Sequence, residues 1–166
     1  TLYTYNTCHN SANWLNTVQI NERNRILAGL DWYEDILHSS TDFNQTSRWN
    51  KAAYAQHRFQ AESFSTELGM RHDDNQDFGS QNSWNGALSV PLNPDNLAIL
   101  SYNEGFRAPT FNDLYYPDFC YFGTCYASAN PDLQPEQSKT WEGQLRSSLS
   151  STSQLQLSLY RTDISD

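Results

Sequence analysis

The residues with the most distinctive chemistry are three cysteines, at positions 8, 120 and 125. Cys120 and Cys125 enclose the tetrapeptide Tyr-Phe-Gly-Thr, and a hairpin-like loop of this length can bring their Cα atoms within the roughly 4.4 to 6.8 Å that a disulfide requires. The alternative is a metal site, which needs more ligands than a lone pair of cysteines supplies, and no histidine lies nearby. The spacing therefore favours a disulfide between Cys120 and Cys125. Cys8 has no local partner, so it is either free or bonded to a cysteine outside this sequence.

A second group with chemical potential is a cluster of oxygen ligands in an expected loop, at Asp73, Asp74, Asn75 and Asp77. Carboxylate and amide oxygens are the ligands that Ca²⁺ takes in proteins. The spacing misses the EF-hand register, because the glycine at the sixth position and the closing glutamate are absent. Acidic loops are more often solvated, so the sequence predicts no cofactor and leaves calcium as the alternative.

Residues 107–138 are the best candidate for ligand contact, because they are dense in aromatic side chains. These are Phe111, Tyr115, Tyr116, Phe119, Tyr121, Phe122 and Tyr126. Leaving so many rings in water without a partner or a packed surface is costly, and each ring offers a large contact area with little loss of conformational entropy. We expect Tyr115, Tyr116, Tyr121 and Phe122 to bind a bulky, partly apolar ligand. The alternative is that the rings pack on one another and on the disulfide to hold the loop in place.

For catalysis the chain offers little. The four histidines are scattered, at His9, His38, His57 and His72. No serine or cysteine lies in a nucleophile-elbow motif, and Glu34 and Asp35 point to opposite faces of an expected strand, which prevents joint acid and base work. The sequence therefore predicts that the chain is not an enzyme.

The elements that position these residues are predicted to be β-strands, since apolar residues recur mostly at every second position. One face of the second expected strand carries Ile26, Ala28, Leu30, Trp32 and Ile36, and Leu155, Leu157 and Leu159 alternate with polar residues near the C-terminus. The pattern predicts about eight strands, at 14–20, 26–37, 49–59, 64–71, 83–90, 96–106, 139–148 and 154–162.

The expected connections alternate in length. Short turns are predicted near 21–25, 60–63, 91–95 and 149–153, and long loops at 38–48, 72–82 and 107–138. In an antiparallel meander, alternate turns lie at the same end, so the short turns share one rim and the long loops the other. Outer-membrane barrels have this asymmetry, and a soluble β-sandwich is the alternative.

Charge and hydropathy limit the function further. The net charge of −9 argues against nucleic-acid binding, which needs lysine and arginine clustered on one face. No stretch approaches the 18 apolar residues of a transmembrane helix. Eight aromatic residues lie within the expected strands, several of them near strand ends, and they are predicted to form an interfacial belt or, alternatively, to pack in a core. They are Trp14, Trp32, Trp49, Trp84, Trp141, Tyr33, Tyr54 and Tyr102.

Two motifs flank the aromatic segment. They centre on Phe106, Arg107, Ala108 and Pro109 before it, and on Asn130, Pro131, Leu133, Pro135 and Glu136 after it, continuing to Trp141 and Glu142. As a pair they resemble the barrel of TonB-dependent outer-membrane receptors. Residues 71–79 and 160–166 are similar to the vitamin B12 (cobalamin) receptors of that family. The likeness covers most of the chain, and its most specific element is NPDLQPE.

The resemblance implies an all-β fold, an antiparallel up-and-down meander of about eight strands that is a partial segment of a large transmembrane β-barrel. Residues 1–166 would form the middle of the barrel, with the plug domain and remaining strands absent. It also implies a place in the outer membrane of a Gram-negative bacterium, in contact with lipid. There a surface loop meets an oxidising environment, which favours the disulfide.

The function implied is capture and import of cobalamin, using energy that the TonB complex transmits through the absent plug. One alternative is a receptor for a ferric siderophore, haem or another metal chelate. A second is a soluble all-β binding domain. No nucleic-acid partner is expected.

Overall fold

A computed structural model describes residues 3–165 of the chain. It contains ten strands and one short helix: β1 (Tyr5–Asn21), β2 (Asn24–Ser39), β3 (Ser47–Gln60), β4 (Ser65–Asn75), β5 (Gly79–Asn93), β6 (Asn96–Arg107), α1 (Phe111–Tyr115), β7 (Phe119–Tyr121), β8 (Thr124–Tyr126), β9 (Glu136–Ser150) and β10 (Ser153–Ser165).

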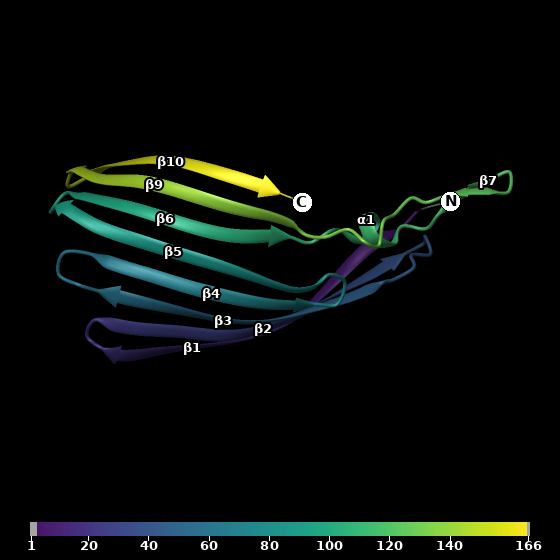
Figure 1. Cartoon of the computed structure of the whole chain (residues 1–166), viewed down its shortest axis with the longest axis horizontal. Helices are drawn as coiled ribbons and strands as arrows, with labels where there is room; N and C mark the ends of the chain where they lie inside the picture. The colour runs from purple at the N-terminus through teal and green to yellow at the C-terminus, as the bar shows by residue number, and fades with distance from the viewer. Residues whose placement is uncertain (1–2, 166) are drawn as a thin grey trace.

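Eight of the strands form one antiparallel sheet in the order β1-β2-β3-β4-β5-β6-β9-β10, and β7 and β8 form a separate hairpin. The predicted meander is therefore confirmed. Figure 1 shows the turns that join β1 to β2, β3 to β4, β5 to β6 and β9 to β10 at one end of the sheet, and the β2–β3 and β4–β5 connections, with α1 and the β7–β8 hairpin, at the other. We call these the turn end and the loop end.

One predicted long loop is wrong. Residues 72–82 do not form a loop, because β4 continues to Asn75 and β5 begins at Gly79, leaving only residues 76–78 between them. Gly79 has a φ of 72°, the left-handed conformation that glycine adopts without cost. Asp73 and Asp74 consequently lie in a strand. The first predicted strand, 14–20, was also too short, since residues from Tyr5 onward pair with β2.

The cross-strand register gives the sheet two different faces. A residue and its antiparallel partner share a face, and Val18, Ile26, His57, Leu68, Gly86, Tyr102, Trp141 and Arg161 make up one such row. The face containing this row carries most of the exposed large apolar side chains, including Trp14, Leu30, Trp32, Met70, Trp84, Leu100, Leu155, Leu157 and Leu159. We call it the apolar face. The predicted grouping of Ile26, Ala28, Leu30 and Trp32 on one face is confirmed.

The opposite, polar face contains Asp31, Asn50, Arg71 and Asp73. Tyr33 and Tyr54 also lie here, so the prediction that they join the tryptophans in one belt is wrong.

Buried apolar side chains are few in residues 3–165: Leu37, Ala52, Phe111 and Leu114. Two of the four belong to α1, so the best-packed part of the described chain includes the helix at the loop end. No helix among the described residues is long and apolar enough to cross a membrane.

Candidate functional site at the loop end

The segment after β6 leaves and re-enters the sheet at one pair of residues. Arg107 ends β6 and lies opposite Glu136, the first residue of β9, with 3.8 Å between Nη1 and Oε2. Next to this pair the ring of Phe106 meets Phe78 edge to face, with the centroids 5.8 Å apart. Proline at 109 removes a backbone donor and biases Ala108 toward an extended conformation. The two motifs of the sequence therefore lie where residues 108–135 leave and re-enter the sheet. We call this region, together with α1, the base of the segment.

Helix α1 follows at once and begins with a capping box. The side chain of Thr110 accepts a hydrogen bond from the backbone N–H of Asp113, and the Asp113 carboxylate accepts from the backbone N–H and the hydroxyl of Thr110. These two donors lower the pKa of Asp113 below its ordinary value. Sequence reasoning missed this helix, although threonine followed three residues later by an acidic residue is the signal that marks such a start.

The side chain of Tyr115 docks α1 onto the turn between β4 and β5. Its hydroxyl donates to Oδ1 of Asp77 at 2.8 Å, and Nε2 of Gln45 donates to the same oxygen at 2.9 Å. Burial, and then the hydrogen bond to Asp77, raise the pKa of Tyr115 to about 12. The side chain of Asp77 is 2% exposed, so the carboxylate end of this contact is shielded from water.

Arg48 of β3 holds the same helix from another side. Its Nη1 donates to the carbonyl of Pro109 at 2.7 Å, and its guanidinium lies 4.9 Å from the centre of the Phe111 ring. Its Nη2 is 3.5 Å from Oδ2 of Asp35, and its Nη1 is 3.8 Å from Oδ2 of Asp77. One cation therefore faces two carboxylates and also contacts the first turn of α1.

Beyond α1 the chain forms a stapled hairpin. Cys120 and Cys125 are partners in the β7–β8 ladder and are joined by a disulfide, as predicted, with 4.0 Å between their Cα atoms. Cys8 is free and exposed. The two turn residues have positive φ, 47° for Phe122 and 83° for Gly123. This conformation is uncommon for a phenylalanine.

The structure divides the four predicted contact residues into two places. Tyr121 and Phe122 meet edge to face at the hairpin tip, with centroids 4.4 Å apart, and Phe122 is 91% exposed. Tyr116 packs edge to face on Phe43 at 5.5 Å, while Tyr115 is engaged with Asp77. The tip pair is therefore free to contact a ligand, and the other two tyrosines belong to the base.

A hydrogen-bonded chain runs from this base along the polar face. Asn50 donates to Asp73 at 2.9 Å and accepts from Asn75 at 3.1 Å, and the Oδ1 of Asn75 accepts the backbone N–H of Asp77 at 3.0 Å. Arg71 joins its far end through two hydrogen bonds to Asp73 and one to Asp31. Sequence reasoning missed Arg48, Asn50 and Arg71, since no local pattern marks side chains that meet across strands.

The salt bridges of Asp73 and Asp77 affect the calcium site that was considered from the sequence. Asp73 and Asp77, two of the proposed ligands, already face Arg71 and Arg48, and no group of three acidic, histidine or cysteine side chains in residues 3–165 could hold a metal. Asp74 lies on the apolar face, away from both.

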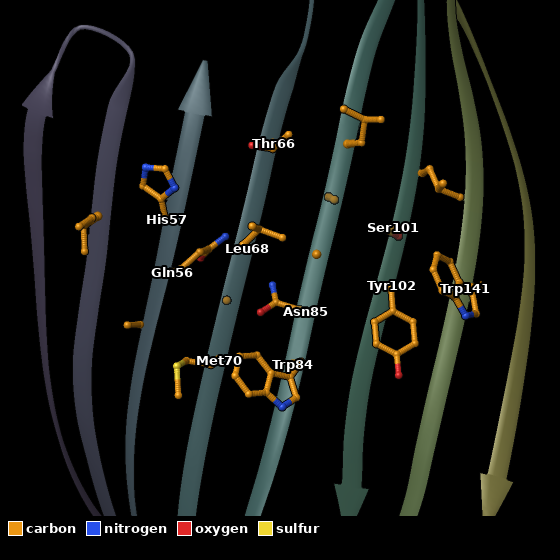
Figure 2. Close-up of a pocket in the computed structure, with 17 residues that line it drawn as sticks. Gln56, His57, Thr66, Leu68, Met70, Trp84, Asn85, Ser101, Tyr102 and Trp141 are labelled. Carbon is orange, nitrogen blue, oxygen red and sulfur yellow. The ribbon is translucent and has the colours of Figure 1, made fainter. Parts of the chain in front are cut away.

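The apolar face is hollowed beside aromatic side chains. Figure 2 shows Trp84, Tyr102 and Trp141 projecting from neighbouring strands, with Leu68 and Met70 beside them. The hollow has a volume of about 820 Å³, and the Tyr102 and Trp141 rings lie 4.8 Å apart. Gly86 leaves space in the row between Leu68 and Tyr102.

Comparison with known proteins identifies the family to which this chain belongs. Residues 2–166 match the family model described as TonB dependent receptor-like, beta-barrel. The chain is 35% identical over 161 residues to a vitamin B12 transporter, BtuB, of Vibrio vulnificus, covering 95% of this chain and 25% of the relative. It is also 35% identical over 145 residues to BtuB of Photobacterium profundum, covering 87% of this chain and 22% of that protein. The chain thus spans about a quarter of the length of these relatives.

Solved structures show the same fold. The siderophore receptor PirA of Pseudomonas aeruginosa superposes with a TM-score of 0.78 at 18% identity, covering 98% of this chain and 32% of that one. The ferric enterobactin receptor PfeA gives a TM-score of 0.76 at 15% identity, covering 98% of this chain and 27% of that one. The family consists of receptors, not enzymes, in line with the lack of a catalytic motif. The chain belongs to the TonB-dependent receptor β-barrel family.

Proposed function

We propose that the protein containing this chain is an outer-membrane receptor that captures vitamin B12 and imports it with energy transmitted by the TonB complex. The observation that carries the proposal is the 35% identity, over nearly the whole chain, to proteins named vitamin B12 transporters. In this reading the sheet is a part of the barrel wall, and the loop end faces outward.

The apolar face supports contact with a bilayer. On each strand its apolar residues stop at a boundary toward the loop end, and this boundary moves progressively toward the turn end from β2 to β10. We define the edge as the last apolar residue, toward the loop end, before a polar one. From β2 to β10 these residues are Trp32, Ala53, Met70, Trp84, Tyr102, Trp141 and Leu159, and the next residues on the same face are Glu34, Lys51, His72, Asn82, Glu104, Lys139 and Arg161.

The shift gives the tilt of the strands. Leu159 shares its cross-strand row with Asn24, and Trp32 lies eight residues beyond Asn24 on β2. The edge thus moves about 26 Å along the strands while crossing about 29 Å of sheet, at roughly 3.3 Å per residue and 4.8 Å per strand spacing. A level edge then requires a tilt of roughly 40°, and transmembrane barrel strands tilt by about 35–45°. Four of the seven edge residues are aromatic, as expected at an interface.

The hairpin tip supports capture of a bulky ligand. Tyr121 and Phe122 present large rings that are held together by the disulfide and by their mutual contact. Phe122 occupies a turn position where glycine or asparagine is usual. The fold alone does not explain a phenylalanine there, whereas a role in binding does.

An iron-chelate receptor is the second candidate function. It is favoured by the solved neighbours, which include siderophore receptors, but their identity of 15 to 18% shows the fold alone. Cobalamin is the better-supported cargo because its evidence comes from sequence identity.

The test is uptake of labelled cobalamin by cells whose only receptor is the full-length protein. We expect uptake that requires TonB and that falls in Phe122→Asn, which keeps the left-handed turn and removes the ring. Loss of a buried aromatic anchor commonly costs about 2 kcal/mol or more, which is roughly thirtyfold in affinity. Uptake of an iron chelate with no uptake of cobalamin would replace the proposed cargo by the second candidate.

A further inference from the structure

Three connections of the chain meet at the loop end. Residues 40–46 bind α1 through the backbone N–H of Asn44, which donates to the carbonyl of Tyr115 at 3.2 Å. Residues 76–78 bind it through Asp77, and residues 108–135 contain it. Helix α1 is therefore the common point of contact for connections that are separate in sequence.

The hairpin is attached to α1 on both of its sides. On the incoming side only residues 116–118 separate the end of the helix from β7. On the outgoing side the backbone N–H of Asn130 donates to the carbonyl of Asp113 at 2.8 Å. A movement of α1 therefore moves the base of the hairpin and carries Tyr121 and Phe122 with it.

The groups that hold α1 in place are charged, and little of either side chain is exposed. The side chain of Asp77 is 2% exposed and that of Arg48 is 12% exposed. In residues 3–165, Oδ2 of Asp77 and Nε of Arg48 are buried atoms without a hydrogen-bond partner. A well-packed apolar pair often matches or exceeds a buried ion pair in stability. A contribution to stability alone therefore gives a weak account of why charged groups stand here.

We propose that Asp77 and Arg48 are positioning residues for ligand capture. They fix α1 against the sheet, and through α1 they fix the hairpin tip, without touching the ligand themselves. This inference rests on the proposed function, because it assigns how the same loop is presented. Arg48 sets the start of the helix through Pro109 and Phe111, and Asp77 sets its end through Tyr115.

The experiment uses the full-length receptor and the variant Tyr115→Phe, which removes one hydroxyl and keeps the ring. A matched control is Tyr102→Phe, which removes a tyrosine hydroxyl bonded to Glu104 at 2.5 Å on the apolar face. Asp77→Asn is the second variant, because it keeps an acceptor for Tyr115 and removes the charge opposite Arg48.

Two readouts separate positioning from simple stability. Amide hydrogen exchange of residues 111–126 is measured without ligand, and the dissociation rate is measured for cyanocobalamin or, if the receptor does not bind it, for the ferric siderophore that it binds. Tyr115→Phe is expected to speed both, with about a tenfold loss of affinity, since a hydrogen bond to a buried charged group is lost. Tyr102→Phe is expected to change neither.

The outcomes are distinguishable. Faster exchange with an unchanged dissociation rate would overturn the positioning role, as would equal effects of Tyr115→Phe and Tyr102→Phe. Unchanged exchange in both Tyr115→Phe and Asp77→Asn would show that these contacts do not hold the helix. If wild type ignores cobalamin but the exchange and siderophore results hold, the proposed cargo fails and the positioning role stands.

Discussion

Arg107 and Glu136 lie opposite each other as the last pair of the β6–β9 ladder, so the 28 residues from 108 to 135 are inserted at a single rung. The strands on either side continue their pairing independently of that insertion, to β5 and to β10. The sheet and residues 108–135 are therefore separable parts of the chain.

Replacing residues 110–133 with a short glycine- and asparagine-containing turn should leave the barrel able to fold and abolish ligand binding. Folding is checked in the full-length receptor by migration of unheated samples in detergent gels, and binding by equilibrium titration. A shortened receptor that retains wild-type affinity would place the ligand site elsewhere.

Arginine at Leu157, the central one of three leucines on β10, should destabilise the folded receptor in a bilayer by about 2 to 4 kcal/mol if the residue lies near the midplane. Arginine at Gln156, its neighbour on the polar face, is the matched control and should cost far less. The measurement is a denaturant titration in lipid vesicles. The reverse order of the two variants would mean that the faces are assigned the wrong way round.

Serine at both Cys120 and Cys125 should weaken ligand binding and leave the stability of the barrel nearly unchanged. The bond closes a short ring, with a sequence separation of 5, and short rings restrict the unfolded chain least. Peptide mapping of the non-reduced wild type should show these two cysteines joined. Finding either one bonded to Cys8 would contradict the structure.

Docking of α1 should be lost at strongly alkaline pH. The pKa of Tyr115 is raised from 10.0 to about 12, so the folded state favours the neutral phenol. The stabilisation is therefore fully present below about pH 10 and is lost as the pH rises through 12. Ultraviolet titration of wild type against Tyr115→Phe isolates this group, and a difference curve centred near pH 10 would show that the phenol is not protected.

Part of this structure could be predicted from sequence. The alternation of Leu155, Leu157 and Leu159 with polar neighbours marked β10 correctly, because one face of that strand is apolar. The alternation of apolar and polar residues disappears beyond the edge of the apolar face, because the residues on both faces of the strands are polar there. Strand β4 beyond Arg71 and strand β1 before Trp14 were missed for that reason.

The site was predicted less completely than the sheet. The cysteine spacing was sufficient to predict the disulfide of the hairpin, because its two cysteines are close together in the sequence. The contact between Tyr115 and Asp77 joins positions that are 38 residues apart, and Arg48 reaches Pro109 across 61. The periodicity of a sequence does not indicate contacts between distant positions. Tyr115 was therefore grouped with the tip residues, although its hydroxyl binds Asp77.

Equilibrium binding to the purified full-length protein decides whether cobalamin is the ligand of this receptor, as we propose. Titration with cyanocobalamin, with and without an excess of a ferric catecholate siderophore, should give saturable binding that the siderophore does not displace. Saturable binding of the siderophore by a receptor that shows no affinity for cyanocobalamin would contradict the proposed function in cobalamin uptake.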